Sequence, residues 1–180
     1  MLKFFTILFC WYSNALAAGT SFYDLQETTL RRQKIDFAKF RGKVVLVVNT
    51  ASKCGYTPQF AGLQDIYKTY ETKGLDVVGI PSNDFNQEAL DGDKIESFCT
   101  INYGVKFTML EKAHVKGKTA SPLMQYLVSH SEKPQEEVHW NFEKFLVNRK
   151  GVVIGRYLSA IAPSDKEFTA AIVKALAEQP

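Results

Sequence analysis

Residues 44–58 read Val-Val-Leu-Val-Val-Asn-Thr-Ala-Ser-Lys-Cys-Gly-Tyr-Thr-Pro. The apolar, mostly β-branched residues 44–48 are typical of a strand buried on both faces. Thr57 and Pro58 then predict the start of a helix, with Thr57 as the N-cap and Pro58 as the first helical residue. A buried strand followed by a short loop and a helix is typical of an α/β fold, and Cys54 lies in that loop.

The other elements follow from hydrophobic spacing and turn residues. We expect a polar edge hairpin or arm over 20–41, strands at 75–80, at 107–110 and around Val115, and a hairpin of 145–148 with 152–157. We expect helices at 58–73, from Asp91 or Asp93 to Gly104, and at 122–129. A last helix should begin at Ser164, which forms a capping box with Glu167. This order predicts an α/β fold with a central mixed sheet flanked by helices. A thioredoxin-like fold is the first choice.

The first seventeen residues have the order of a secretory signal peptide. Lys3 gives a positive start, residues 4–12 form an apolar centre, and Ala15-Leu16-Ala17 places small residues before a cleavage site. We therefore expect cleavage near Ala17 and export, to the periplasm or outside the cell. A membrane anchor and a lipid attached through Cys10 are the alternatives. The apolar stretch is shorter than the roughly 20 residues that span a bilayer.

Composition limits the function classes. The chain has 180 residues, 22 of them basic and 19 acidic, and 46% are hydrophobic. Without residues 1–17, which carry Lys3 as their one charge, 163 residues remain with 21 basic and 19 acidic side chains, a net charge of +2. That length predicts one domain, 18–180, with a substantial core. The balanced charge argues against nucleic acid or an anionic membrane as partner.

Two cysteines would remain in the mature chain. Cys54 lies before a predicted helix N-terminus, where free N–H groups and the helix dipole favour a thiolate, and its neighbours are polar or small. Thr57 stands where a thioredoxin-type motif has its second cysteine, so adjacent-dithiol chemistry is unavailable. Cys99, on a helix, is by itself typical of core packing. The pair could form a structural disulfide, or Cys99 could attack an oxidised Cys54.

Three segments together resemble the glutathione peroxidases. Residues 49–57 (NTASKCGYT), 81–88 (PSNDFNQE) and 140–147 (WNFEKFLV) are similar to that family's three signature segments, in the family's order. The resemblance covers the chain from about 42 to 157. It implies a thioredoxin-like fold and an antioxidant peroxidase that reduces hydrogen peroxide and organic hydroperoxides, with neither cofactor nor metal.

The resemblance also implies roles for individual residues. Cys54 would be the peroxidatic nucleophile, and Gln87, Trp140 and Asn141 would complete the family's catalytic tetrad. Their indole and amide groups are donors without titratable charge, suited to stabilise a thiolate and the charge on a departing oxygen. The second signature is one residue shorter than is usual in the family, so Asn86 is the alternative to Gln87.

The segment 98–107 resembles the resolving-cysteine segment of the thioredoxin-dependent branch. This implies that the sulfenic acid of Cys54 condenses with Cys99, and that a dithiol protein reduces the disulfide. No arginine cluster matches a glutathione site, which favours a thioredoxin-like reductant over glutathione. The short stretch between Ser129 and Trp140 lacks the insertion of tetrameric members, so we expect a monomer or a dimer.

Other classes stay open at this stage. A non-enzymatic thioredoxin-fold module would use Cys54–Cys99 as a structural disulfide. A copper or disulfide carrier would need paired cysteines that the chain lacks. A cysteine–histidine hydrolase would need a base near Cys54, and His139 is the one candidate, since His114 and His130 lie far from the motifs. The three histidines show no metal-ligand spacing.

Overall fold

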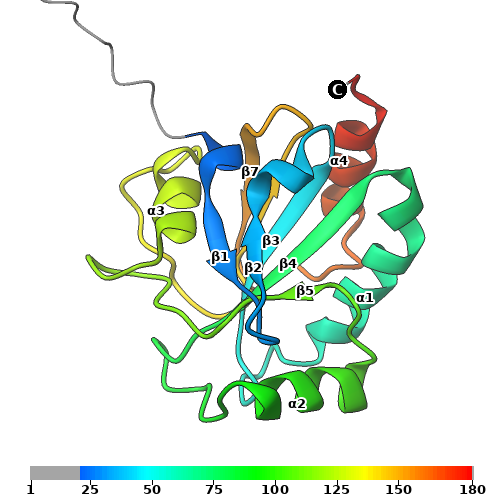
Figure 1. Cartoon of the computed structure of the whole chain (residues 1–180). Helices are drawn as coiled ribbons and strands as arrows, with labels where there is room; N and C mark the ends of the chain where they lie inside the picture. Colours follow the sequence, from blue (N-terminus) through cyan, green and yellow to red (C-terminus); the bar gives the residue numbers. More distant parts are fainter. Residues whose placement is uncertain (1–20, 180) are drawn as a thin grey trace, which may run out of the picture.

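The computed structural model describes residues 21–179. Its centre is a five-stranded mixed sheet in the order β5-β4-β3-β6-β7 (Figure 1). The first three of these strands are parallel, and the last two are antiparallel to their neighbours. The strands are β3 (Val44–Thr50), β4 (Leu75–Pro81), β5 (Thr108–Met109), β6 (Lys144–Val147) and β7 (Val153–Tyr157). The predicted central mixed sheet is therefore confirmed.

Helices cover both faces of the sheet (Figure 1). Helices α1 (Gln59–Tyr70), α2 (Asp93–Tyr103) and α4 (Lys166–Ala177) complete the apolar cluster on one face. The short 3-10 helix η3 (Glu71–Lys73) extends α1. The cluster on the other face is completed by α3 (Pro122–Ser129) and the 3-10 helices η1 (Phe22–Asp24) and η2 (Phe37–Phe40). No helix within 21–179 is long and apolar enough to cross a membrane.

The central strand β3 joins the two clusters. All seven of its residues are buried, with Val44, Leu46 and Val48 facing the α1 side and Val45 and Val47 facing the α3 side. Full burial of such a side chain stabilises the fold by about 1.5–3 kcal/mol. Because both faces of β3 are apolar, the strand has no solvent side, as its sequence predicted.

The N-terminal hairpin is present and covers a sheet edge. Strands β1 (Gln26–Thr28) and β2 (Lys34–Asp36) pair antiparallel. Thr29, at the hairpin tip, forms a bridge with Leu110, and the Leu30 N–H donates to the Met109 carbonyl at 3.0 Å. The hairpin thus shields the short edge strand β5.

Two helices begin and are capped differently from what the sequence predicted. Helix α1 begins at Gln59, with Pro58 as its N-cap, and Thr57 does not cap it. Helix α2 follows Gly92 without a side-chain cap, and the carboxylate of Asp91 pairs with Lys112 instead. The predicted C-terminal limits are confirmed, because Gly74 (φ 98°) and Gly104 (φ 63°) adopt the left-handed conformation that ends a helix.

Two further predictions were wrong. The last helix is capped by Asp165, whose carboxylate accepts from the N–H groups of Glu167 and Phe168, and not by Ser164. Val115 lies in a loop, because its N–H donates to the Asp84 carboxylate and not to a strand. The predicted signal peptide falls outside the described residues.

Three loops meet at one edge of the sheet. Parallel strands β3 and β4 end there side by side, with Thr50 opposite Pro81. Antiparallel β6 begins at the same edge, where Lys144 lies opposite Val48. The residues that follow β3, those that follow β4 and those that precede β6 therefore converge, although they are distant in sequence.

Candidate active site

The loop after β3 holds Cys54, whose side chain is buried. The Cys54 N–H donates to Thr57 Oγ1 at 2.9 Å, and that hydroxyl donates to the Ala51 carbonyl at 2.9 Å. The Tyr56 N–H points to Cys54 Sγ at 3.4 Å. Thr57 therefore closes the loop instead of capping α1, and a backbone N–H donor faces the sulfur.

This loop is bonded to the loop that follows β4. The Lys53 N–H donates to the Gln87 carbonyl at 3.0 Å. The N–H and hydroxyl of Ser52 donate to the Glu88 carboxylate at 2.9 and 2.6 Å, and the Leu90 N–H donates to it at 3.2 Å. Glu88 is 2% exposed. Three donors offset the large cost of burying this carboxylate, so Glu88 fixes the two loops together.

Gln87 and Asn141 are brought into direct contact. Asn141, which is fully buried, donates through Nδ2 to Gln87 Oε1 at 2.8 Å. The Asn86 side chain is exposed, and its backbone adopts the left-handed conformation, with φ 57°. The geometry thus joins Gln87, and not the alternative Asn86, to Asn141. The buried Asn141 Oδ1 has no hydrogen-bond partner within the described part of the chain.

Trp140 lies at the rim of this group. Its side chain is 40% exposed and packs on the ring of Phe85, with the ring centres 5.1 Å apart. Its carbonyl accepts from Asn49 Nδ2 at 3.0 Å. Among residues 21–179 no hydrogen bond joins the side chain of Trp140, Gln87 or Asn141 to the Cys54 sulfur. Gln87 and Asn141 are thus bonded directly, whereas Cys54 is connected to this group through the loop backbone.

Buried charges hold the segment before β6. Phe142 is left-handed, with φ 67°, a strained conformation for a large side chain. Its N–H donates to the Asn49 carbonyl at 2.6 Å, and its carbonyl accepts from the fully buried Lys144 Nζ at 2.8 Å. Burial lowers the pKa of Lys144 to about 8, and the charge of Glu143 opposes that shift. These bonds fix the turn that carries Trp140 and Asn141.

His139 belongs to a separate ionic group. Its Nδ1 lies 2.9 Å from Oε1 of the fully buried Glu143. Oε2 of the same carboxylate accepts from Arg156 Nε and Nη2 at 3.1 and 2.9 Å. The imidazole thus faces Glu143, and the geometry gives no support to a cysteine–histidine hydrolase based on Cys54.

Cys99 is a free thiol on α2, 1% exposed. Burial and, to a lesser extent, the charge of Glu88 raise the pKa of this thiol to about 12. The Cys99 side chain is therefore a buried, protonated thiol at pH 7 while α2 is folded. No group of three or more potential metal ligands occurs within the described residues.

Comparison with known proteins identifies the family. The glutathione peroxidase family model matches residues 22–128. A glutathione peroxidase-like peroxiredoxin of Schizosaccharomyces pombe is 47% identical over 148 residues, which cover 81% of this chain and 94% of the relative. The chain belongs to the glutathione peroxidase family. Two of the segments that carry the resemblance, 49–57 and 81–88, lie within the residues that the family model matches.

Solved structures agree with this assignment. The crystal structure of Trgpx in its apo form matches with a TM-score of 0.71 at 33% identity, covering 89% of this chain and 98% of that one. A thiol:disulfide interchange protein of the thioredoxin family from Chlorobium tepidum matches with a TM-score of 0.66 at 17% identity, covering 87% and 96%. The second likeness concerns the fold alone, and together they confirm a thioredoxin-like fold.

Several residues that hold the candidate site together were not predicted from the sequence. Glu88, Asn49 and Phe85 had no predicted role, and Thr57 belongs to the Cys54 loop and not to the cap of α1. One indication was present in the sequence, since Glu88 and Asn49 both lie inside the signature segments. Their partners, however, are 36 and 91 positions away, which no local pattern reveals.

Asp84 fixes the loop that carries Phe85. Its carboxylate accepts from the N–H groups of Val115 and Lys116 at 2.6 and 3.3 Å and lies 2.6 Å from His114 Nδ1. Burial opposes ionisation, but these three partners outweigh it and hold the pKa of Asp84 below its ordinary value of 3.8. The Asp84 carboxylate thus fixes the loop that carries Phe85, on which Trp140 packs.

We expect Asp84→Asn to lower the free energy of unfolding by about 1–2 kcal/mol at pH 7. Because the folded pKa is depressed, this contribution is present above the unfolded pKa of 3.8 and is lost as pH falls through the folded value. Urea denaturation of both proteins between pH 2.5 and 7 measures it. Asp65→Asn, at an exposed site on α1, is the control. A difference that stays constant with pH would contradict the assignment.

Proposed function

We propose that the chain is a two-cysteine thiol peroxidase with Cys54 as the peroxidatic residue. The observation that carries the proposal is the Cys54 loop, whose sulfur faces the Tyr56 N–H and whose backbone is bonded to the loop of Gln87 and Glu88. Relatives named glutathione peroxidase-like peroxiredoxins support the same chemistry.

In the first step the Cys54 thiolate attacks the terminal oxygen of a hydroperoxide. The S–O bond forms as the O–O bond breaks, and the departing oxygen takes up a proton and leaves as water or an alcohol. Cysteine is oxidised to the sulfenic acid. Gln87, Asn141 and the Trp140 indole supply uncharged donors for the developing charge.

In the second step Cys99 resolves the sulfenic acid. Its thiol sulfur displaces hydroxide, which leaves as water, and the Cys54–Cys99 disulfide forms. The structure holds both cysteines as free thiols, and not as the structural disulfide that the alternative requires. Because the Cys99 thiol is buried on the folded helix, this step requires α2 to loosen so that the two sulfurs can meet.

Two electrons from a dithiol protein then restore the thiols. A thioredoxin-like reductant fits better than glutathione, because no arginine cluster matches a glutathione site in the sequence. The short connection between Ser129 and Trp140 supports a monomer or a dimer. The order of Lys3, the apolar residues 4–12 and Ala15-Leu16-Ala17 supports export to the periplasm or outside the cell.

Steady-state peroxide reduction with glutathione and with thioredoxin, side by side, tests this proposal. We expect faster turnover with thioredoxin, because its dithiol reduces an internal disulfide through a single mixed-disulfide intermediate. Hydrogen peroxide and an organic hydroperoxide serve as substrates, with enzyme-free reactions as controls. Faster turnover with glutathione would contradict the proposed reductant, and no turnover with either would contradict the peroxidase.

A further inference from the structure

A cavity of about 420 Å³ lies outside the Cys54 site. It is enclosed by the tip of the β1–β2 hairpin, by β5 with the residues before it, and by the second half of α2. Its volume falls within the roughly 300–1,000 Å³ of small-molecule sites. Neither Cys54 nor its tetrad partners line this cavity, so it is separate from the peroxide site.

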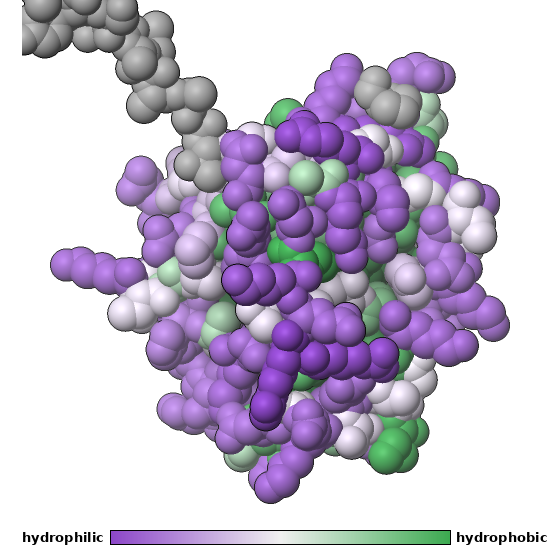
Figure 2. Space-filling view, viewed as in Figure 1, coloured by the Kyte–Doolittle hydropathy of each residue, from purple (hydrophilic) through white to green (hydrophobic). Residues whose placement is uncertain are grey.

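The cavity has an apolar floor. Leu30 and Ile35 from the hairpin and Phe107 and Met109 from the β5 segment line it, and each of these side chains is less than a tenth exposed. Figure 2 shows hydrophilic side chains over much of the hairpin face of the molecule, with small apolar areas between them. An apolar floor of this kind suits an aliphatic chain.

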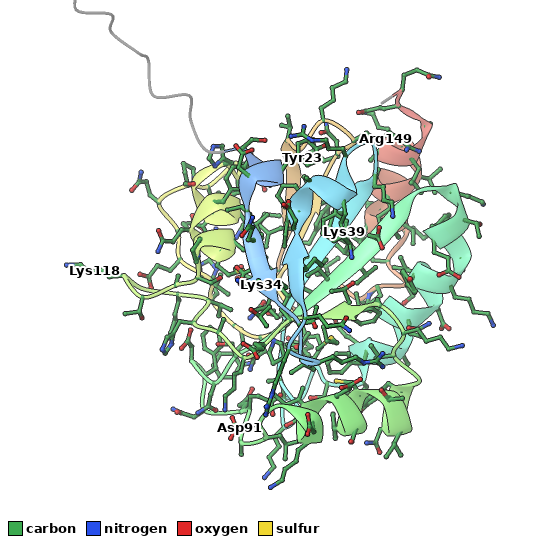
Figure 3. The ribbon with its side chains drawn as sticks, in the orientation of Figure 1. Tyr23, Lys34, Lys39, Asp91, Lys118 and Arg149 are labelled. Atoms are coloured by element: carbon green, nitrogen blue, oxygen red, sulfur yellow. The ribbon has the colours of Figure 1, made fainter. Side chains whose placement is uncertain are left out.

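The rim of the cavity is cationic. Lys34, Lys39 and Lys106 line it and are exposed, and Figure 3 shows Lys34 and Lys39 on the hairpin side of the molecule. Two acidic residues also line the cavity, but Glu96 pairs with Arg31, and the Asp36 carboxylate accepts from the Ala38 N–H. The three lysines make no ion pair with a carboxylate in the described part of the chain, so the rim carries a net positive charge.

We propose that this cavity binds a single-chain amphipathic anion, a long-chain carboxylate. The aliphatic tail lies on the floor, and the carboxylate contacts the lysine rim. Charge complementarity selects the anion, and the floor selects a tail over a small hydrophilic anion. A nucleotide fits less well, since the floor presents apolar side chains where a sugar needs polar partners.

The site lies against the helix that carries the resolving cysteine. Glu96, Cys99 and Thr100 of α2 line it. An occupant in contact with this face of α2 stabilises the folded helix, because the ligand binds the closed form and not the open one. In the framework of the proposed function, such a carboxylate slows formation of the Cys54–Cys99 disulfide. Binding itself does not depend on that function.

Calorimetric titration of the reduced protein with laurate, kept below its micelle concentration, tests the site. We expect laurate to bind, dodecanol to bind about tenfold more weakly because it lacks the charge, and acetate not to bind because it lacks the tail. Lys34→Gln with Lys106→Gln weakens laurate binding about tenfold. Lys150→Gln with Lys174→Gln, two exposed lysines elsewhere, has the same charge change and leaves it unaltered.

Two further measurements locate the ligand. Thr108→Phe, at a half-buried position that lines the cavity, fills the space and abolishes binding, and its melting temperature checks that it folds. Laurate slows amide hydrogen exchange in α2 of the wild type. The proposal is overturned if laurate does not bind, if the Lys34/Lys106 variant binds as tightly as its control, or if exchange in α2 is unchanged at saturation.

Discussion

Replacement of Cys54 by serine is expected to lower peroxide consumption at least about a thousandfold. A serine hydroxyl in the same loop is almost wholly protonated at pH 7 and is a far weaker nucleophile than a thiolate. The donors around the loop cannot compensate, because stabilising the departing oxygen does not turn a protonated hydroxyl into a strong nucleophile. Steady-state removal of hydrogen peroxide with a thioredoxin system measures the loss.

The substitution changes one atom, so the fold should persist. Ser164→Ala is a suitable control, because Ser164 is exposed and the structure shows that it does not cap α4. Both variants should melt within a few degrees of the wild type. Peroxide turnover by a folded Cys54→Ser protein at more than a few per cent of the wild-type rate would exclude Cys54 as the nucleophile.

The second large effect is expected in Cys99→Ser. Turnover with thioredoxin should be lost, because no internal disulfide can form, whereas one turnover should survive at Cys54. Thiol counts on the chain 18–180, which contains two cysteines, distinguish the steps. One equivalent of peroxide should remove both thiols from the wild type and the single thiol of the variant, which ends as a sulfenic acid.

A wild-type chain that shows no free thiols before peroxide would instead indicate a structural disulfide. Full multiple turnover of Cys99→Ser with thioredoxin would remove Cys99 from the mechanism while leaving the peroxidatic role of Cys54 intact. The two variants therefore test the two roles separately.

The parts of the fold that depend on neighbouring residues were predictable. The apolar run of β3, the glycines at 74 and 104, and the helix 122–129 each carry their determinants within a few positions. Helix starts were less predictable, because Ser, Thr and Asp side chains have several possible partners. Thr57 bonds to the Cys54 loop, and Asp165 in place of Ser164 caps the last helix.

The signature segments name the candidate residues Cys54, Gln87, Trp140 and Asn141 but not the bonds that connect them. The contact of Asn141 with Gln87 and the exposure of Asn86 depend on how β3, β4 and β6 align at one edge of the sheet. The role of Glu88 was not predictable either. The free-energy cost of burying its carboxylate is offset only where the fold brings Ser52 within hydrogen-bond distance.

Glu88 has a consequence for the order of events in the proposed catalytic cycle. Its carboxylate is bonded to Ser52 in the loop that holds Cys54, and its charge helps to keep the Cys99 thiol protonated. A thiol that is both protonated and out of water is poorly attacked by peroxide, so irreversible overoxidation threatens Cys54 well before Cys99. In the proposed mechanism, the Cys99 thiol thus escapes oxidation by excess peroxide and stays able to form the disulfide once α2 opens.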